Sequence, residues 1–198
     1  MPLSPSEYRS QTRRSHLPVV FWLACVGIVF ILVSSIIGAP LAAAYDHPKF
    51  AFTVYYSFAP LCHQLPERSF FIAGHQFAVC ARCTGLYAGF ALVLLLYPLI
   101  RSLHSTDVPQ VRWLFLAAAP LAIDFSLTFF GIWENTHTSR LLTGLLLGGV
   151  TVFYVMPGIV ELAHRLQSQQ RKVTGTFTVS SEAIAAAPSD YSAPQRRI

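Results

Sequence analysis

Four long apolar segments constrain the fold of this chain more than any other feature. They cover residues 17–44, 84–103, 111–133 and 140–162. Each is long enough to cross a bilayer, since a transmembrane helix needs about 20 apolar residues. Only 12% of the 198 residues are charged, roughly half the share of a soluble domain. The sequence therefore predicts an all-α membrane protein with four transmembrane helices.

The first apolar segment has two interpretations. Arginines precede it, and Ala42-Ala43-Ala44 offers the small residues of a signal-peptide cleavage site. However, residues 17–37 are uncharged over a longer stretch than the roughly 7–15 apolar residues of a signal peptide. An uncleaved helix is therefore favoured, and cleavage stays open as the alternative. Cys25, inside this helix, is expected to be a buried apolar residue.

The Lys and Arg residues predict the orientation. If both termini are cytoplasmic, ten of the 14 lie inside and four lie outside, namely Lys49, Arg68, Arg82 and Arg140. Membrane proteins carry this excess on the cytoplasmic side. We therefore expect a cytoplasmic arm (1–16), a membrane domain (17–164) and a tail (165–198) in the cell (inner) membrane. The tail is too polar to form a core, so it is predicted to be disordered.

The expected partner is the lipid bilayer. The net charge of +5 does not indicate nucleic acid, because the chain has no basic stripe or reading motif. Gly85 and Gly89 form one small-xxx-small pair, and Gly144 and Gly148 form another. Such pairs let helices approach closely, so they could join copies of the chain in a homo-oligomer.

Residues 45–83 are predicted to form an extracytoplasmic loop. Its first part, residues 46–61, is aromatic and too short to span, which indicates a helix lying at the membrane interface. Its second part gathers candidate metal ligands or redox thiols: Cys62, His63, His75, Cys80 and Cys83.

Three interpretations of these cysteines stay open. Three Cys and one His can close a tetrahedral site, so Cys62, His63, Cys80 and Cys83 are the predicted ligands of zinc or iron, with His75 as the alternative ligand. Alternatively, the Cys80–Cys83 pair, directly before a helix, has the setting of a reactive thiol. The chain would then be a membrane thiol–disulfide oxidoreductase coupled to a quinone. The third interpretation is a structural disulfide between Cys62 and one of the pair.

Asp124 lies inside the third apolar segment, about 12 Å from its outer end at 1.5 Å per residue. A carboxylate in the membrane indicates a functional site. Arg140 is predicted to reach it through Thr128 or Thr143, which makes Asp124 and Arg140 the candidate catalytic residues. Two alternatives are a structural polar clamp and a small transporter or lipid-binding protein. Arg68 and Arg82 are expected at the entrance to the cysteine site, where they could face an anion or a lipid headgroup.

These residues belong to a long pattern: CHQ-x-PERSF, GHQ-x-x-VCARCTGLYAG, a membrane Asp, and R-x-x-TG-x-x-x-G. Over roughly residues 50–160 it resembles the domain-of-unknown-function 2085 family of prokaryotic membrane proteins. The resemblance implies that further positions belong to the motif: Gln64, Pro66, Ser69, Phe70, Thr84, Gly85, Tyr87, Gly89, Thr143 and Gly144. In that family a Gln often follows the aspartate by one turn, where Thr128 stands here. No activity is assigned to the family, so the resemblance implies a site but no reaction.

Overall fold

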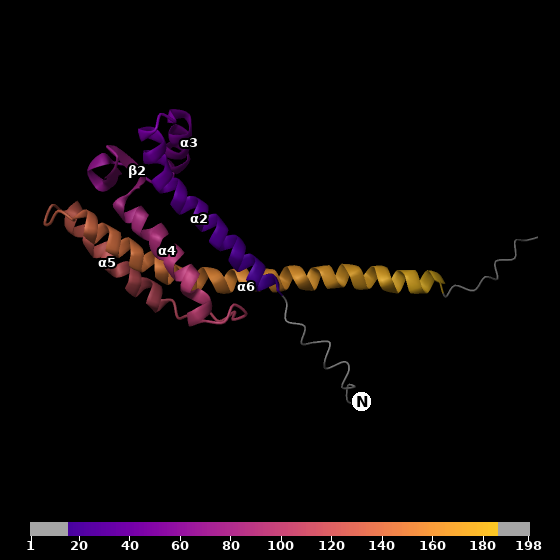
Figure 1. Ribbon diagram of the computed structural model, residues 1–198. Coiled ribbons are helices and arrows are strands. Elements are labelled where there is room, and N and C mark those ends of the chain that lie inside the picture. The colour runs from indigo at the N-terminus through magenta and orange to yellow at the C-terminus, as the bar shows by residue number, and fades with distance from the viewer. Residues whose placement is uncertain (1–15, 186–198) are drawn as a thin grey trace, which may run out of the picture. The chain divides into compact units, whose positions relative to one another are not determined.

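The computed structural model describes the backbone of residues 16–185 and the side chains of residues 16–166 (Figure 1). Its elements are α2 (Leu17–Ala44), α3 (Pro48–Phe58), η1 (Pro66–Arg68), β1 (Ser69–Ile72), β2 (His75–Cys80), α4 (Ala81–Ile100), α5 (Arg112–Phe129) and α6 (His137–Ala185). The chain forms two compact units, Met1–Glu161 and Leu162–Ile198. Apart from the end of α6, the features below belong to the first unit.

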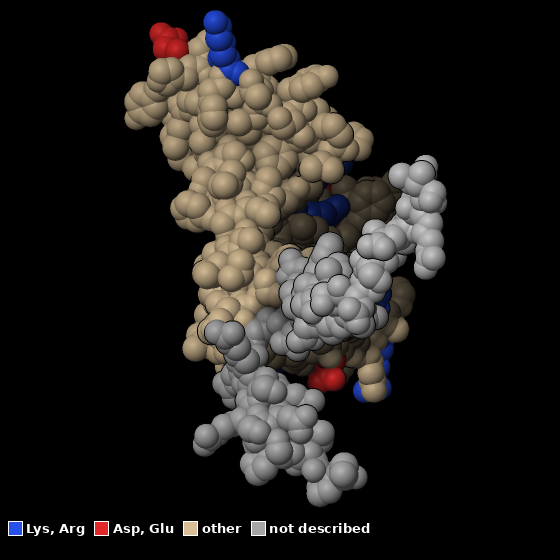
Figure 2. Space-filling model, turned by 90° about the vertical axis from the view of Figure 1, so that its right-hand side faces the viewer, with Lys and Arg blue, Asp and Glu red and all other residues tan. Residues whose placement is uncertain are grey.

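Four helical stretches are long and apolar enough to cross a membrane: Leu17–Ala44, Ala81–Ile100, Arg112–Phe129 and His137–Leu166. The prediction of an all-α membrane protein with four spans is therefore confirmed. Large apolar side chains are exposed on the spans, among them Phe30 and Ile31 of α2 and Phe115 of α5. Most of the described surface in Figure 2 carries no charged side chain, as expected for a surface covered by acyl chains.

The third span ends earlier than the sequence predicted. α5 stops at Phe129, and Gly131 follows with a positive φ of 68°. The Gly131 N–H donates to the Thr128 carbonyl (3.1 Å) and the Ile132 N–H to the Leu127 carbonyl (3.0 Å). This pair of bonds is a Schellman cap, which a glycine in the left-handed region permits. Asp124 consequently lies roughly 8 Å from the helix end at 1.5 Å per residue, not 12 Å.

The two small-xxx-small pairs pack α4 directly against α6. A Cβ added at Gly85 would lie 2.1 Å from the Leu141 carbonyl oxygen, and one at Gly148 would lie 2.1 Å from that of Leu86. Gly89 and Gly144 make equally close approaches, at 2.1 and 2.2 Å. This contact lies within one chain, and the association of copies through these glycines stays a prediction.

The predicted extracytoplasmic loop contains a β-hairpin that the sequence analysis missed. β1 and β2 pair antiparallel, with Ile72 opposite His75 and Ser69 opposite Cys80. Ala73 and Gly74 connect them, with φ values of 50° and 78°. Positive φ at both positions is what a two-residue turn needs to match the twist of the two strands. The hairpin returns the chain toward Cys62 before α4 begins.

One apolar core holds the hairpin against the helices. Ile36 and Ala39 of α2 and Phe58 of α3 are buried with Ala78 and Val79 of β2. The predicted interfacial helix is present as α3, over Pro48–Phe58. A second core lies farther along α4, where Leu94, Tyr97, Val152 and Met156 are buried and Cys25 packs against them.

The tail differs from the prediction. α6 continues to Ala185, although residues 165–198 were expected to be disordered. No proline interrupts residues 158–187, and extending an existing helix avoids the cost of nucleation. The predicted arm falls almost entirely on residues 1–15, which lie outside the described part of the chain, as do residues 186–198.

Candidate metal centre

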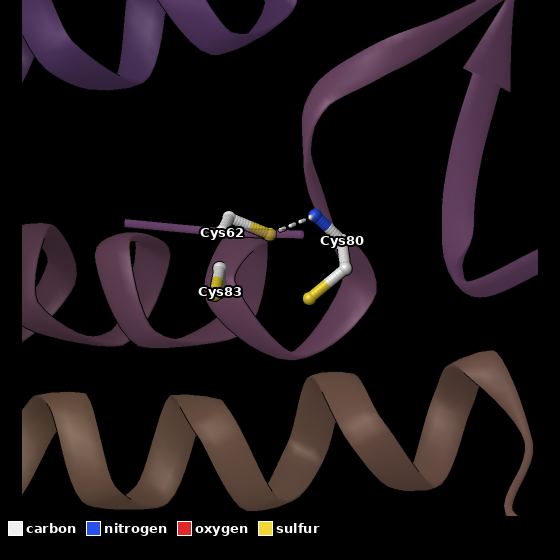
Figure 3. A group of neighbouring side chains, drawn as sticks. All are labelled: Cys62, Cys80 and Cys83. Atoms are coloured by element: carbon white, nitrogen blue, oxygen red, sulfur yellow. Dashed lines mark hydrogen bonds between the residues drawn. The ribbon is translucent and has the colours of Figure 1, made fainter. Parts of the chain in front are cut away.

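Three of the four cysteines meet where the chain enters α4 (Figure 3). Cys62 follows α3, Cys80 ends β2 and Cys83 lies in the first turn of α4. Their three Sγ atoms all lie within 4.8 Å of one another. The Cys80 backbone N–H donates a hydrogen bond of 3.2 Å to the Cys62 Sγ. The hairpin therefore brings together sulfur atoms that are 18 residues apart in the sequence.

The environment of Cys80 favours the thiolate. Hydrogen bonds from the thiols of Cys62 and Cys83 hold the pKa of Cys80 far below its ordinary 9.0, although burial acts in the opposite direction. The backbone at Arg82 and Cys83, in the first turn of α4, also lowers this pKa. A thiolate is the form of cysteine that binds metal and attacks disulfides.

Neither predicted histidine joins the three sulfur atoms. Among the described residues, the cluster of potential metal-ligand atoms consists of the three cysteines. His63 is exposed and lines the cavity beside them. His75 is exposed at the turn end of the hairpin, opposite Ile72. His63 is thus the nearer candidate for a fourth ligand, as its place next to Cys62 suggested.

A cavity of about 560 Å³ opens beside the cysteines. Residues from the loop, α4, α5 and α6 line it: Leu61, Cys62, His63, Gln64, Leu65, Arg68, Cys80, Arg82, Cys83, Phe125, Thr128, Phe129, Asn135 and Arg140. The size is in the range of small-molecule sites, about 300–1,000 Å³. Figure 2 shows Lys or Arg side chains set into a recess of the surface.

Asp124 pairs with Arg82, not directly with Arg140. The Arg82 Nη2 donates to the Asp124 Oδ2 at 2.7 Å. Asn135 joins the other side: its Nδ2 donates to the same Oδ2 at 2.7 Å, and its Oδ1 accepts from the Arg140 Nε at 2.6 Å. The predicted pairing of Asp124 with Arg140 is therefore corrected to a bridge through Asn135. Arg82, between the two cysteines of the CxxC pair, fills the position expected of Arg140.

Asn135 is a site residue that the sequence analysis did not find. It lies in the turn between α5 and α6, where an asparagine is common for local reasons. Neither expected bridge bonds Arg140: Thr128 Oγ1 donates to the Asp124 carbonyl (3.2 Å) and accepts from the Asn135 N–H (3.4 Å), and Thr143 Oγ1 donates to the Ser139 carbonyl (2.9 Å). Nothing in the local sequence separates this asparagine from an ordinary turn residue.

Two glutamines of the motif fix the cysteine loop to the hairpin. Gln64 has a positive φ of 51°, and its Nε2 donates to the Tyr55 carbonyl at 2.7 Å. The Gln76 Nε2 donates to the Gln64 carbonyl at 3.1 Å, and the Tyr55 hydroxyl donates to the Gln76 carbonyl. Burial raises the pKa of Tyr55, which keeps this hydroxyl a donor. The three residues set the position of Cys62 relative to β2.

Several further motif positions lie in α4, contact it or line the cavity. The Thr84 Oγ1 donates to the Cys80 carbonyl at 3.1 Å. Tyr87 packs edge-on against Phe58, with ring centroids 6.0 Å apart. Gly85 and Gly144 form part of the α4–α6 contact. Arg68 is exposed and lines the cavity.

Comparisons with known proteins find uncharacterised relatives. An uncharacterized protein of Methanocaldococcus jannaschii is 38% identical over 112 residues, which cover 57% of this chain and 72% of that protein. An uncharacterized protein of Methanothermobacter thermautotrophicus is 38% identical over 88 residues, or 44% of this chain and 78% of that protein. No solved structure matches the chain. Residues 62–154, which contain the cysteine cluster and the Asp124 network, match the family described as "Predicted membrane protein (DUF2085)". The chain therefore belongs to the DUF2085 family of membrane proteins.

Proposed function

We propose that this membrane protein binds a metal ion through Cys62, Cys80 and Cys83. The observation that carries the proposal is the approach of the three Sγ atoms to within 4.8 Å of one another. Tetrahedral zinc with Zn–S bonds of about 2.3 Å holds its sulfur ligands roughly 3.8 Å apart. The observed upper limit of 4.8 Å is about 1 Å above that separation.

Thiolate ligands favour zinc or iron over magnesium and calcium. The start of α4 favours a negatively charged sulfur. The low pKa of Cys80 provides one thiolate before the ion binds. Metal binding itself releases thiol protons.

The three cysteines and His63 line the same cavity, so a fourth ligand would come from that side. His63 lines that cavity and can complete a structural site, whereas a water there would give the open position of a catalytic site. In either case Arg82 and Asp124 hold the first turn of α4 against α5, so they position the thiolates.

We further propose that the site is extracytoplasmic and that both termini are cytoplasmic, in the cell (inner) membrane. The ten-to-four distribution of Lys and Arg supports this orientation. α2 packs against α3 and β2 through buried Ile36 and Ala39, which favours an uncleaved first helix. A single cysteine at Ser105, in a background with the native cysteines replaced, should label with a membrane-impermeant maleimide only after the cells are opened. Labelling in intact cells would show that the loop containing Ser105 is outside, which contradicts the proposed orientation.

The decisive experiment measures bound metal and free thiols on detergent-purified protein prepared without chelator. We expect about one zinc or iron per chain, with thiols that react only after chelation. Cys62→Ser, Cys80→Ser and Cys83→Ser should each lose the metal. Cys25→Ser is the matched control and should keep it, because Cys25 packs in the second core. Metal content in Cys80→Ser equal to that of the wild type would refute the proposal.

The same measurement decides between this proposal and the redox alternative. Protein without metal, with two thiols missing until a reductant is added, would establish a disulfide among the three cysteines. A quinone-coupled enzyme relays electrons through a second cysteine pair, and the only further cysteine, Cys25, packs in the other core. The structure therefore favours the metal proposal over this one.

The fourth ligand is tested by His63→Ala, with His75→Ala as the control. If His63 binds the ion, its variant should lose at least about tenfold in zinc affinity while the control matches the wild type. Equal affinities would assign the fourth position to water or to an exogenous ligand.

The transporter alternative has its own test. A change in solute uptake by Asp124→Asn at unchanged metal content would favour a transporter.

A further inference from the structure

The cavity beside the cysteines is strongly basic. Arg68, Arg82 and Arg140 line it from three different elements, and His63 adds an imidazole. None of the residues that line it is Asp or Glu. Three guanidinium groups around one cavity repel one another unless an anion lies between them.

Among the described residues, only Arg82 of the three arginines has a carboxylate partner. Asp124 pairs with Arg82 at 2.7 Å. In the part of the chain that the structure describes, neither Arg68 nor Arg140 forms an ion pair, and the Arg140 Nε bonds the neutral Asn135. The buried Nε of Arg82 is also a donor without a partner among the described residues. The cavity therefore holds hydrogen-bond donors that await an acceptor.

The arginines leave the cavity with a net positive charge. Asp124 cancels one of their three positive charges, and the other two remain to attract an anion.

Part of the cavity lining is apolar and exposed at the surface, and the Arg82 guanidinium lies over the Phe125 ring at 5.8 Å. Phe125 and Phe129 line the cavity from α5, and their side chains are 51% and 73% exposed on a membrane-spanning helix. Leu61 and Leu65 extend the apolar lining from the loop. A ligand with a charged head and an apolar tail would satisfy both parts of the lining, whereas a free anion would use only the basic part.

We propose that the cavity binds the phosphate group of an anionic amphiphile, such as a phosphodiester lipid. Arg68 and Arg140 bind the phosphate oxygens, because guanidinium groups match the geometry of phosphate. The apolar part of the ligand lies along Phe125 and Phe129.

The test uses the full-length protein in detergent and follows its melting temperature during titration. The probes are dihexanoyl phosphatidylglycerol, dihexanoyl phosphatidylcholine and inorganic phosphate, so that the head-group charge and the tail are varied separately. We expect phosphatidylglycerol to raise the melting temperature most and phosphatidylcholine least. Arg68→Gln and Arg140→Gln should weaken binding of phosphatidylglycerol at least about tenfold. Arg112→Gln, at the start of α5, is the control and should bind as the wild type does.

The outcomes separate this proposal from the metal site. Arg68→Gln should lose the lipid and keep the metal, whereas Cys80→Ser should lose the metal and keep the lipid. Arg68 has no partner among the described residues that its loss would leave unpaired, so this variant stays informative even if Arg140→Gln fails to fold. Stabilisation by inorganic phosphate alone would support a phosphate site and overturn its assignment to an amphiphile. No response to phosphatidylglycerol or phosphate, or an equal response from Arg68→Gln, would overturn the proposal.

Discussion

Replacing Gly148 with alanine tests the contact that joins α4 to α6. The new Cβ would lie 2.1 Å from the Leu86 carbonyl oxygen, where ordinary contact begins at 3.4 Å. The obstacle is helix backbone, which cannot rotate away as a side chain can. The two helices must therefore separate by roughly 1.3 Å, the difference between these distances, and the contacts at Gly85, Gly89 and Gly144 loosen with them. Overpacking of this kind costs about 1–3 kcal/mol.

Gly158→Ala is the matched control. Gly158 lies in the same helix, and nothing lies within 4 Å of a Cβ at that position. Both variants gain the same helix propensity, up to about 1 kcal/mol, so their difference isolates the steric term. Thermal unfolding in detergent, followed by circular dichroism, should place the melting temperature of Gly148→Ala about 2–12 °C below that of the control. Equal melting temperatures would refute the α4–α6 contact.

Three further predictions follow from single contacts. Asp124→Asn leaves the Arg82 guanidinium without its charged partner and should destabilise the protein by about 1.5–3 kcal/mol; Asp107→Asn, whose carboxylate is 89% exposed, should change thermal stability by less than about 0.5 kcal/mol. Gly131→Ala places a Cβ on a residue with φ of 68° and should cost about 1 kcal/mol, with Gly131→Asn costing less in the same melting experiment. The pKa of Cys80 is low in the folded protein and has its ordinary value of 9.0 in the unfolded chain. Between these two values the unfolded chain binds one more proton than the folded protein. The free energy of unfolding of metal-free protein should therefore rise from pH 5 to pH 8. Iodoacetamide alkylation of Cys80, read by mass spectrometry, should stay nearly constant over this range in the folded protein and rise steeply in the unfolded one.

The helices were predictable because lipid imposes a simple requirement. A segment of about 20 apolar residues with no charge has few alternatives to a membrane-spanning helix. A cluster of the three cysteines was also predictable from the sequence. Their number and residue type limit them to a metal site or a disulfide, and either one requires the sulfur atoms to lie close together. The end of α5 was readable in principle from Gly131, which suits a left-handed cap.

The hairpin and the polar network were harder to foresee. Ala73-Gly74 is a weak turn signal compared with Asn-Gly, so residues 69–80 resembled an irregular loop. The choice between Arg82 and Arg140 as the partner of Asp124 depends on how α4 and α5 are rotated about their axes, which hydropathy does not encode. Asn135 contributes only because both of its amide atoms meet charged side chains from other helices.

Arg82 connects the cysteine cluster to helix packing. It stands between Cys80 and Cys83, its carbonyl lies against Gly144 of α6, and its side chain bonds Asp124 of α5. If the proposed ion binds, it would hold the two neighbouring sulfur atoms and thereby restrict the spacing of three membrane helices. Thermodynamic linkage makes this relation reciprocal. If a ligand that draws Arg82 away from Asp124 weakens binding of the ion by some factor, the ion weakens binding of that ligand by the same factor. The residue inside the CxxC motif would then transmit the state of the membrane-embedded helices to the metal.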